Sequence, residues 1–299
     1  MMKVQIFSDL HTEFSAFTPR IGGDVDVVVL AGDIGPHPRM LHRWAALCEP
    51  SGAQLVFVAG NHEFYGRNHA RWLLQFREGA EAVCGAMAGR VHVLEHDAVA
   101  IGGVRFLGAT AWTDFTACGD DPGRVAEAMF EARLCMADFA EILVGPTQRV
   151  WGGGAHARMT PEHQAGLSRA ARAWFTERLL EPFDGPTVVV THHAPALACI
   201  DTPTHRARFP ASLLDAAYAN SWDCVGRQGE PALLGPGCHL ARPADLWVYG
   251  HSHVAGRLRH GHTLCVSNPR GYPGESASTG FDPLLTWCVT SHGIDAGEG

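Results

Sequence analysis

The chain has 299 residues, and its 46% hydrophobic and 18% charged content is ordinary for a folded protein and argues against extensive disorder. The formal net charge of -8 argues against a large nucleic-acid surface, although nucleic acid stays open as a partner. The nine cysteines are odd in number and include no C-x-x-C pair, which excludes an obvious disulfide framework or zinc ribbon. No apolar segment approaches bilayer length and the N-terminus lacks a signal-peptide pattern, so we expect a cytoplasmic protein without membrane contact.

In chain order, short apolar runs that stop at polar clusters predict buried strands, and helix-like spacing fills the gaps between them. The first strands are expected at residues 3–7, 25–31 and 55–59, with helices at 40–47 and 72–87. Three β-like runs between residues 91 and 108 predict the start of a second sheet. Further strands are expected at 187–190, 246–249, 263–267 and 284–289.

Two stretches interrupt this alternation. Residues 115–181 contain a helical segment, a glycine-rich loop at 152–154 and a helix starting at Thr160-Pro161, where Thr can cap and Pro suits the first turn. We interpret this stretch as an inserted cap, and residues 198–242 as a second, irregular insert. The prediction is a single α/β domain over residues 1–299, with two sheets packed face to face between outer helices.

Side chains that bind divalent cations follow five of the predicted strands. Strand ends of an open α/β sheet converge at one edge, and such cations take oxygen and imidazole ligands. Each motif alone has an ordinary explanation: a turn at Asp9 and His11, a helix cap at Asn61, satisfied polar groups at the histidines. Their joint occurrence in this order is difficult to assign to chance. The candidate ligands are Asp9, His11, Asp33, Asn61, His192, His251 and His253.

These residues belong to five short motifs: Asp9-Leu10-His11, Gly32-Asp33, Gly60-Asn61-His62-Glu63, Thr191-His192-His193 and Gly250-His251-Ser252-His253. The series resembles the signature blocks of the calcineurin-like metallophosphoesterases, and the resemblance spans residues 9–253. It implies a four-layer α-β-β-α sandwich with two mixed sheets and a dinuclear centre at one edge. It also implies two divalent cations, with Mn, Fe or Zn as candidates.

The resemblance further assigns roles by position. Asp9, His11, Asp33 and His253 would hold one cation, and Asp33, Asn61, His192 and His251 the other. Asp33 would bridge the pair, since metals roughly 3.5–4 Å apart clamp the attacking and leaving oxygens of an in-line displacement. The nucleophile would be a metal-bound hydroxide.

Asp33 and His62 are the expected catalytic residues. His62 corresponds to the family's histidine that is not a ligand and that stabilises the phosphoryl charge or protonates the leaving oxygen; an orienting role is the alternative. Matching His-x-x-Pro to residues 192–195 makes His192 the ligand, with His193 as the alternative.

Other candidates are weaker. Trp112 is expected to be a buried anchor near the centre, and Arg270 is either a phosphate contact or an ordinary surface arginine. Asp138, His156 and Arg158 in the cap could reach over the metals, although polar residues of an insert are usually solvated.

The predicted function is therefore metal-dependent hydrolysis of phosphoesters, with a small-molecule phosphodiesterase or phosphatase favoured. Protein Ser/Thr phosphatase, nuclease and non-catalytic metal-stabilised scaffold remain alternatives, as does a purely structural role for the histidines. A small phosphoester is the expected partner, and the sequence leaves the oligomeric state open.

Overall fold

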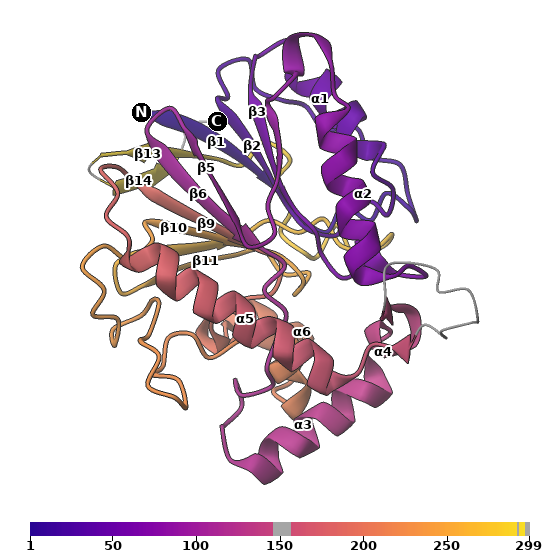
Figure 1. Cartoon of the computed structure of the whole chain (residues 1–299), viewed down its shortest axis with the longest axis vertical. Helices are drawn as coiled ribbons and strands as arrows, with labels where there is room; N and C mark the ends of the chain where they lie inside the picture. Colours follow the sequence, from indigo (N-terminus) through magenta and orange to yellow (C-terminus); the bar gives the residue numbers. More distant parts are fainter. Residues whose placement is uncertain (146–156, 292, 297–299) are drawn as a thin grey trace.

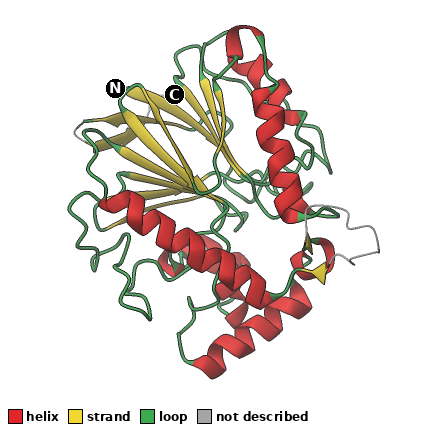
Figure 2. Cartoon of the chain, viewed as in Figure 1, coloured by secondary structure: helices red, strands yellow, loops and turns green. Residues whose placement is uncertain are grey.

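Two six-stranded mixed sheets pack face to face, and helices cover their outer faces (Figures 1 and 2). This computed structural model describes residues 1–145, 157–291 and 293–296. The arrangement confirms the predicted α/β sandwich of two mixed sheets with flanking helices. Within the described residues no helix is long and apolar enough to cross a membrane.

The first sheet has the strand order β14-β13-β1-β2-β3-β4, and its strands β1 to β4 run parallel. Helices α1 (Met40–Cys48) and α2 (His69–Glu81) cover its outer face through a core that includes Leu41, Trp44 and Phe76. The bounds are β1 Met2–Phe7, β2 Val27–Ala31, β3 Gln54–Val58, β4 Val91–Val93, β13 Thr286–Thr290 and β14 Gly293–Ala296.

The second sheet has the order β11-β12-β10-β9-β6-β5, with antiparallel strands β11 and β5 at its two edges. Its outer face is covered by α5 (Pro161–Leu180), whose Phe175 packs with Trp222 and Trp247. The bounds are β5 Asp97–Ile101, β6 Val104–Ala109, β9 Thr187–Thr191, β10 Leu246–Tyr249, β11 Gly256–His260 and β12 Thr263–Ser267.

The predicted start of the second sheet at residue 91 is wrong. β4 pairs in parallel with β3 in the first sheet, because the crossover through α2 returns the chain beside the strand it left. The chain passes to the second sheet only after β4, near His96, which adopts a left-handed φ of 50°.

The inner faces of the two sheets share an apolar core built from both, which includes Val29, Val56, Val190 and Val248. β2, β3, β9 and β10 are buried along most or all of their lengths, as expected for parallel strands covered on both faces. This core fixes the strands, so the loops after them hold their side chains on a rigid support.

The stretch interpreted as a cap divides into two parts. Its first part lies outside the two six-stranded sheets and contributes Cys135, Met136 and Ala137 to the wall of a cleft. This part consists of α3 (Pro122–Cys135), α4 (Asp138–Glu141) and the short strands β7 (Leu143–Val144) and β8 (Ala157–Arg158). Its second part, α5, belongs to the outer layer of the second sheet, and Thr160 caps it by accepting from the N–H of His163. The glycine-rich loop at 152–154 lies outside the described residues.

The irregular insert packs on this cap, where α3 contacts η4 (Leu213–Ala217). The insert also contains η3 (Leu197–Cys199) and α6 (Pro203–Arg208). Two further short turns of helix, η1 (His62–Phe64) and η2 (Gly85–Met87), follow β3 and α2.

Candidate metal centre

The loops that follow β1, β2, β3, β9 and β10 meet at one edge of the sandwich and bring all seven predicted ligands together. Every one of the seven is buried. Two groups form around Asp33. We call Asp9, His11 and His253 the first subsite, and Asn61, His192 and His251 the second subsite.

The backbone at this edge is strained. Non-glycine residues rarely adopt a left-handed φ, because Cβ then approaches the carbonyl oxygen at a cost of about 1–2 kcal/mol. Such strain persists only where the surroundings enforce it, and it concentrates at functional sites. Five of the seven candidate ligands adopt this conformation: Asp9 (50°), His11 (45°), Asp33 (55°), His251 (68°) and His253 (49°).

Three motif glycines make the close approach of the loops possible. A Cβ on Gly32 would lie 2.2 Å from His192 Nδ1, and one on Gly60 would lie 2.2 Å from Asp33 Oδ1. A Cβ on Gly250 would lie 2.7 Å from Asp9 Oδ2. The glycine before each ligand therefore leaves room for a ligand of another motif.

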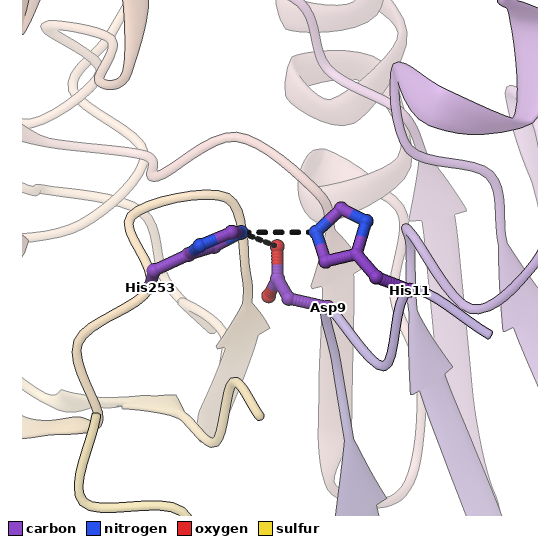
Figure 3. Close-up of side chains that lie close together, drawn as sticks. All are labelled: Asp9, His11 and His253. Atoms are coloured by element: carbon purple, nitrogen blue, oxygen red, sulfur yellow. Dashed lines mark hydrogen bonds and ion pairs between the residues drawn. The ribbon is translucent and has the colours of Figure 1, made fainter. Parts of the chain in front are cut away.

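In the first subsite, His11 Nε2 lies 3.0 Å from His253 Nε2, and His253 Nε2 lies 3.5 Å from Asp9 Oδ1 (Figure 3). His11 Nδ1 is 3.0 Å from Glu13 Oε1, and His253 Nδ1 is 2.8 Å from Glu275 Oε2. Because an ionised carboxylate only accepts hydrogen bonds, both Nδ1 atoms carry a proton, which leaves the two Nε2 atoms, facing each other, to bind a cation. Asp9 Oδ2 is buried without a hydrogen-bond partner among the described residues. A cation between these atoms satisfies all of them.

The second subsite shows the same pattern. His192 donates from Nδ1 to the carbonyl of Ala31 (2.9 Å), and its Nε2 faces Asn61 Oδ1 at 3.0 Å. The amide of Asn61 is oriented because its Nδ2 donates to Asp138 Oδ1 (2.8 Å) and to the Tyr65 hydroxyl (3.0 Å). His251 Nε2 is buried without a partner among the described residues. Here too, side-chain atoms that can bind a metal converge, and a cation between them would satisfy them.

Asp33 lies between the two subsites. Its Oδ2 is 3.7 Å from His11 Nε2 and 3.4 Å from His192 Nε2, and its Oδ1 accepts from the N–H of His62 (2.8 Å). Burial alone would raise the pKa of Asp33, but the neighbouring histidines hold it well below its usual value. Burial likewise lowers the pKa of His192, yet Asp33 and Asp9 raise it to about 10. The site therefore attracts positive charge, as a metal centre must.

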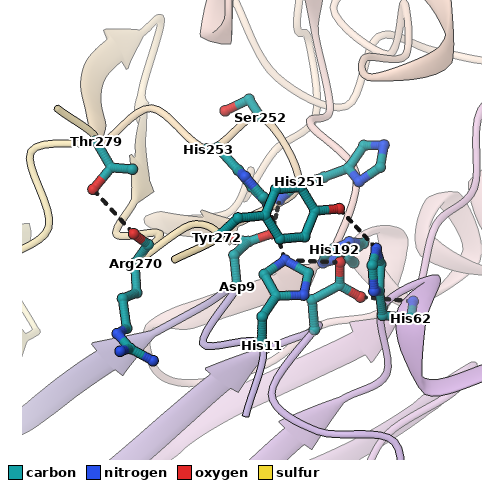
Figure 4. A network of polar contacts seen from close by, with 12 residues as sticks. Asp9, His11, His62, His192, His251, Ser252, His253, Arg270, Tyr272 and Thr279 are labelled. Atoms are coloured by element: carbon teal, nitrogen blue, oxygen red, sulfur yellow. Dashed lines mark hydrogen bonds and ion pairs between the residues drawn. The ribbon is translucent and has the colours of Figure 1, made fainter. Parts of the chain in front are cut away.

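His62 is held at the edge of the cluster by three contacts. Its Nε2 lies 2.9 Å from the Tyr272 hydroxyl (Figure 4). Its Nδ1 lies 3.1 Å from Glu13 Oε1, and its ring stacks on Tyr65 at 4.2 Å. Burial alone would lower the pKa of His62, but the charges of Asp33, Glu13 and Glu63 raise it to about 9. His62 is thus positioned to carry a proton. A ligand role is also within its reach, since one of its ring nitrogens lies within 4.8 Å of ligand atoms of His11 and Asp33.

His192 and His193 lie in different surroundings. His193 turns its Nδ1 to the carbonyl of Thr110 (3.3 Å) and packs between Trp112 and His251. Burial and the charge of His192 lower the pKa of His193 to about 3. Of these two histidines, only His192 lies within ion-pair distance of Asp33 in the described structure. The geometry favours His192 as the ligand, and the assignment stays a prediction until metal content is measured.

The weaker candidates separate clearly. Trp112 is buried against Phe64 and His69, as predicted for an anchor. Arg270 points away from the cluster and donates to the carbonyls of Leu10 and Ser15, so it stabilises the loop after β1 (Figure 4).

In the cap, Asp138 is buried and orients Asn61, a role that the sequence did not single out. Arg158 is exposed on β8, and His156 lies outside the described residues.

Sequence reasoning missed four supporting side chains. Glu63, although part of a quoted motif, was given no role; its buried carboxylate accepts four backbone N–H groups, from Asp33, Ile34, Gly35 and Gly60, and so ties the loops after β2 and β3 together. Glu13 and Glu275 fix the imidazoles of the first subsite. Tyr272 covers His11 and His253 with its ring. No local pattern marked Glu13, Glu275 or Tyr272, because their partners lie in other loops.

Comparison with known proteins supports this geometry. Residues 2–105 match the family Metallophos, described as calcineurin-like phosphoesterase. The resemblance to the calcineurin-like phosphoesterases is confirmed. The match includes Asp9, His11, Asp33, Asn61 and His62 and agrees with the predicted enzyme class, a phosphoesterase. The remaining candidate ligands, which follow β9 and β10, lie outside the matched segment and meet the others through the fold.

A solved structure titled phosphopantetheinyl hydrolase (PptH) from Mycobacterium tuberculosis superposes with a TM-score of 0.61 at 15% identity, covering 99% of this chain and 95% of the other. The superposition shows that the two chains share a fold over 99% of this chain. An uncharacterized protein, L509, of Acanthamoeba polyphaga mimivirus is 20% identical over 92% of this chain and 93% of its own length.

Proposed function

We propose that this chain hydrolyses small phosphoesters with two divalent cations, one at each subsite, on either side of Asp33. One observation carries the proposal: on both sides of Asp33, buried atoms of the kind that bind metals converge, with His11 Nε2 3.0 Å from His253 Nε2 and His192 Nε2 3.0 Å from Asn61 Oδ1. Nitrogen and oxygen donors of this kind suit Mn, Fe or Zn, and affinity order does not select among them.

The protein's own residues would divide the work as follows. Asp9, His11 and His253 would hold one cation, Asn61, His192 and His251 the other, and Asp33 both. The cations, when bound, would supply Lewis-acid chemistry, including a lowered pKa of water. The strained, buried loops fix the ligands before substrate arrives, so little reorganisation is needed during the reaction.

His62 is the candidate general acid. Its raised pKa of about 9 leaves it protonated at neutral pH, and its contact with the exposed Tyr272 places it at the cleft. A protonated imidazole beside the phosphoryl group would stabilise its charge or give the leaving oxygen a proton.

The cleft over the two subsites supports a small substrate. It encloses about 270 Å³ and is lined by Asn61, His62, Tyr218, Tyr272 and neighbouring residues. The cap contributes Cys135, Met136 and Ala137 to its wall. A partly covered cleft of this size favours a small phosphomonoester or diester over a folded phosphoprotein or a duplex, in agreement with the acidic net charge of -8.

The test is a screen of the protein, loaded in turn with Mn, Fe(II) and Zn, against small mono- and diesters, nucleotides, phosphopeptides and nucleic acids. We expect turnover of small esters that is absent from an Asp33→Asn variant of the same preparation. Preference for phosphopeptides or nucleic acids would redirect the substrate class. Two bound metals without any turnover would support a scaffold, and no bound metal would leave the histidines a structural role; either result contradicts the proposal.

A further inference from the structure

A second pocket lies next to the metal cleft and has no role in holding cations. It encloses about 180 Å³ between α6 and η4. Phe209, Tyr218 and Ser252 line both this pocket and the cleft, so the two cavities adjoin each other. The pocket therefore lies beside the place where a group bound to a phosphorus atom in the cleft would extend.

The wall of this pocket is mainly apolar. Phe209, Pro210, Leu214 and the ring of Tyr218 form most of it. Phe209 is 39% exposed and lines both cavities. Binding of an apolar group against this wall is favourable, because it removes apolar surface from water.

The pocket offers no charge to a charged guest. No lysine or arginine lines either cavity within the described part of the chain. The one carboxylate in the pocket wall, Asp215, is paired with Arg206 at 2.8 Å. Burial lowers the pKa of His205, which keeps this ring of the wall neutral. A second phosphate, a carboxylate or an ammonium group would lose its hydration here without gaining a partner.

We infer that this pocket, formed chiefly by Phe209, Pro210, Leu214 and Tyr218, binds an uncharged, largely apolar ester group of the substrate while the phosphoryl group occupies the metal cleft. The inference rests on the proposed function and narrows its substrate class to phosphoesters of compact, uncharged alcohols. Hydrolysis breaks the bond between phosphorus and the ester oxygen, water supplies OH to phosphorus and H to that oxygen, and no further reactant is needed. The released alcohol leaves from the pocket.

The test uses n-alkylphosphonates, which cannot be hydrolysed, from methyl to octyl. Their binding to the Mn(II)-loaded protein is measured by titration calorimetry. The dissociation constant should fall about fourfold for each added methylene, the gain expected for burying apolar surface. The gain should stop when the pocket is full, and 180 Å³ corresponds to roughly six water-sized groups. A carboxylate at the end of the hexyl chain should remove most of the affinity gained from its methylenes.

Two matched variants locate the effect. Phe209→Ala should weaken hexylphosphonate binding about tenfold and methylphosphonate binding much less, because only the longer chain reaches the aromatic wall. Phe130→Ala is the control: Phe130 is 64% exposed on α3 and lines neither cavity. It should leave the dependence on chain length unchanged.

The outcomes separate this inference from the proposed function. Turnover of small phosphoesters combined with phosphonate affinity that is independent of chain length overturns the inference alone. Equal behaviour of the two variants, or tighter binding of the chain that ends in a carboxylate, also overturns it. Failure of even methylphosphonate to bind the metal-loaded protein, together with no turnover, overturns both.

Discussion

The two subsites of the candidate metal centre each combine two histidines with one oxygen ligand, but these ligands are supported differently. In the first subsite, His11 and His253 are oriented by Glu13 and Glu275, whose side chains are 20% and 29% exposed. In the second subsite, His192 is oriented by a backbone carbonyl of β2, and Asn61 by the buried Asp138.

This difference has a physical consequence. A backbone carbonyl inside a sheet cannot rotate away or be protonated, whereas a partly exposed carboxylate can do both. Mutation of a residue that orients a metal ligand typically weakens metal binding by about 10–100-fold. We therefore expect the second subsite to be the more rigid of the two, and the first to exchange its cation more readily.

The largest effect is expected from a substitution that weakens both subsites at once. Asp33→Asn takes away the carboxylate shared by both, so hydrolysis should fall by more than about 10⁴-fold, beyond what a single acid–base group contributes. Metal analysis of the variant should show loss at both subsites. Loss of only one cation per chain would mean that Asp33 does not bridge.

His62→Ala should separate chemistry from metal binding. Turnover should fall by about 10²–10⁴-fold, the usual contribution of a general acid. Metal content should stay that of the unmodified chain, as measured by elemental analysis on the same samples. A variant that loses metal would show that His62 is a ligand and that the division of roles is mistaken.

Substitutions of the orienting carboxylates test the comparison itself. Glu275→Gln should weaken the cation of the first subsite, and Asp138→Asn that of the second, each by about 10–100-fold. Metal titration followed with a spectroscopically distinct ion, such as Co(II), reads the two sites separately. If both variants weaken the same cation, the two subsites are not independently supported.

The smallest effect on the metals is expected at a histidine outside both subsites. Burial lowers the pKa of His69 to about 4, so the folded protein keeps the ring neutral while the unfolded chain binds a proton below about pH 6.5. The contribution of neutral His69 to the free energy of unfolding is thus fully present above pH 6.5. About 3 kcal/mol of it is lost as the pH falls towards 4.

His69→Phe preserves the ring that packs on Phe64 and removes this titration. Its free energy of unfolding, from denaturant titrations at several pH values, should fall less steeply between pH 6.5 and 4. An unchanged slope would contradict the assignment. The stability of this variant at each pH also shows whether loss of a cation in acid precedes unfolding of the chain.

The sequence predicted the strands and the convergence of their ends well, for a physical reason. Buried parallel strands leave uninterrupted apolar runs, as in β2 and β10, and the polar residue after each run marks the sheet edge. The predicted ligands lie together because strand order brings those ends to one place.

What escaped prediction depends on partners chosen in three dimensions. The pairing of β4 with β3, the packing of α5 on the second sheet and the contact of Asp138 with Asn61 are set by tertiary packing, and nothing in the local pattern specifies them. Glu63 was visible in its motif, but its four backbone donors come from two loops.

Anomalous diffraction tests the central claim most directly. Crystals of protein purified without chelator and loaded with Mn or Zn would be measured on both sides of the metal's absorption edge. Two anomalous peaks should lie on either side of Asp33, roughly 3.5–4 Å apart, one at each subsite. A single peak, or fully loaded crystals with peaks elsewhere, would contradict the dinuclear centre proposed for this chain.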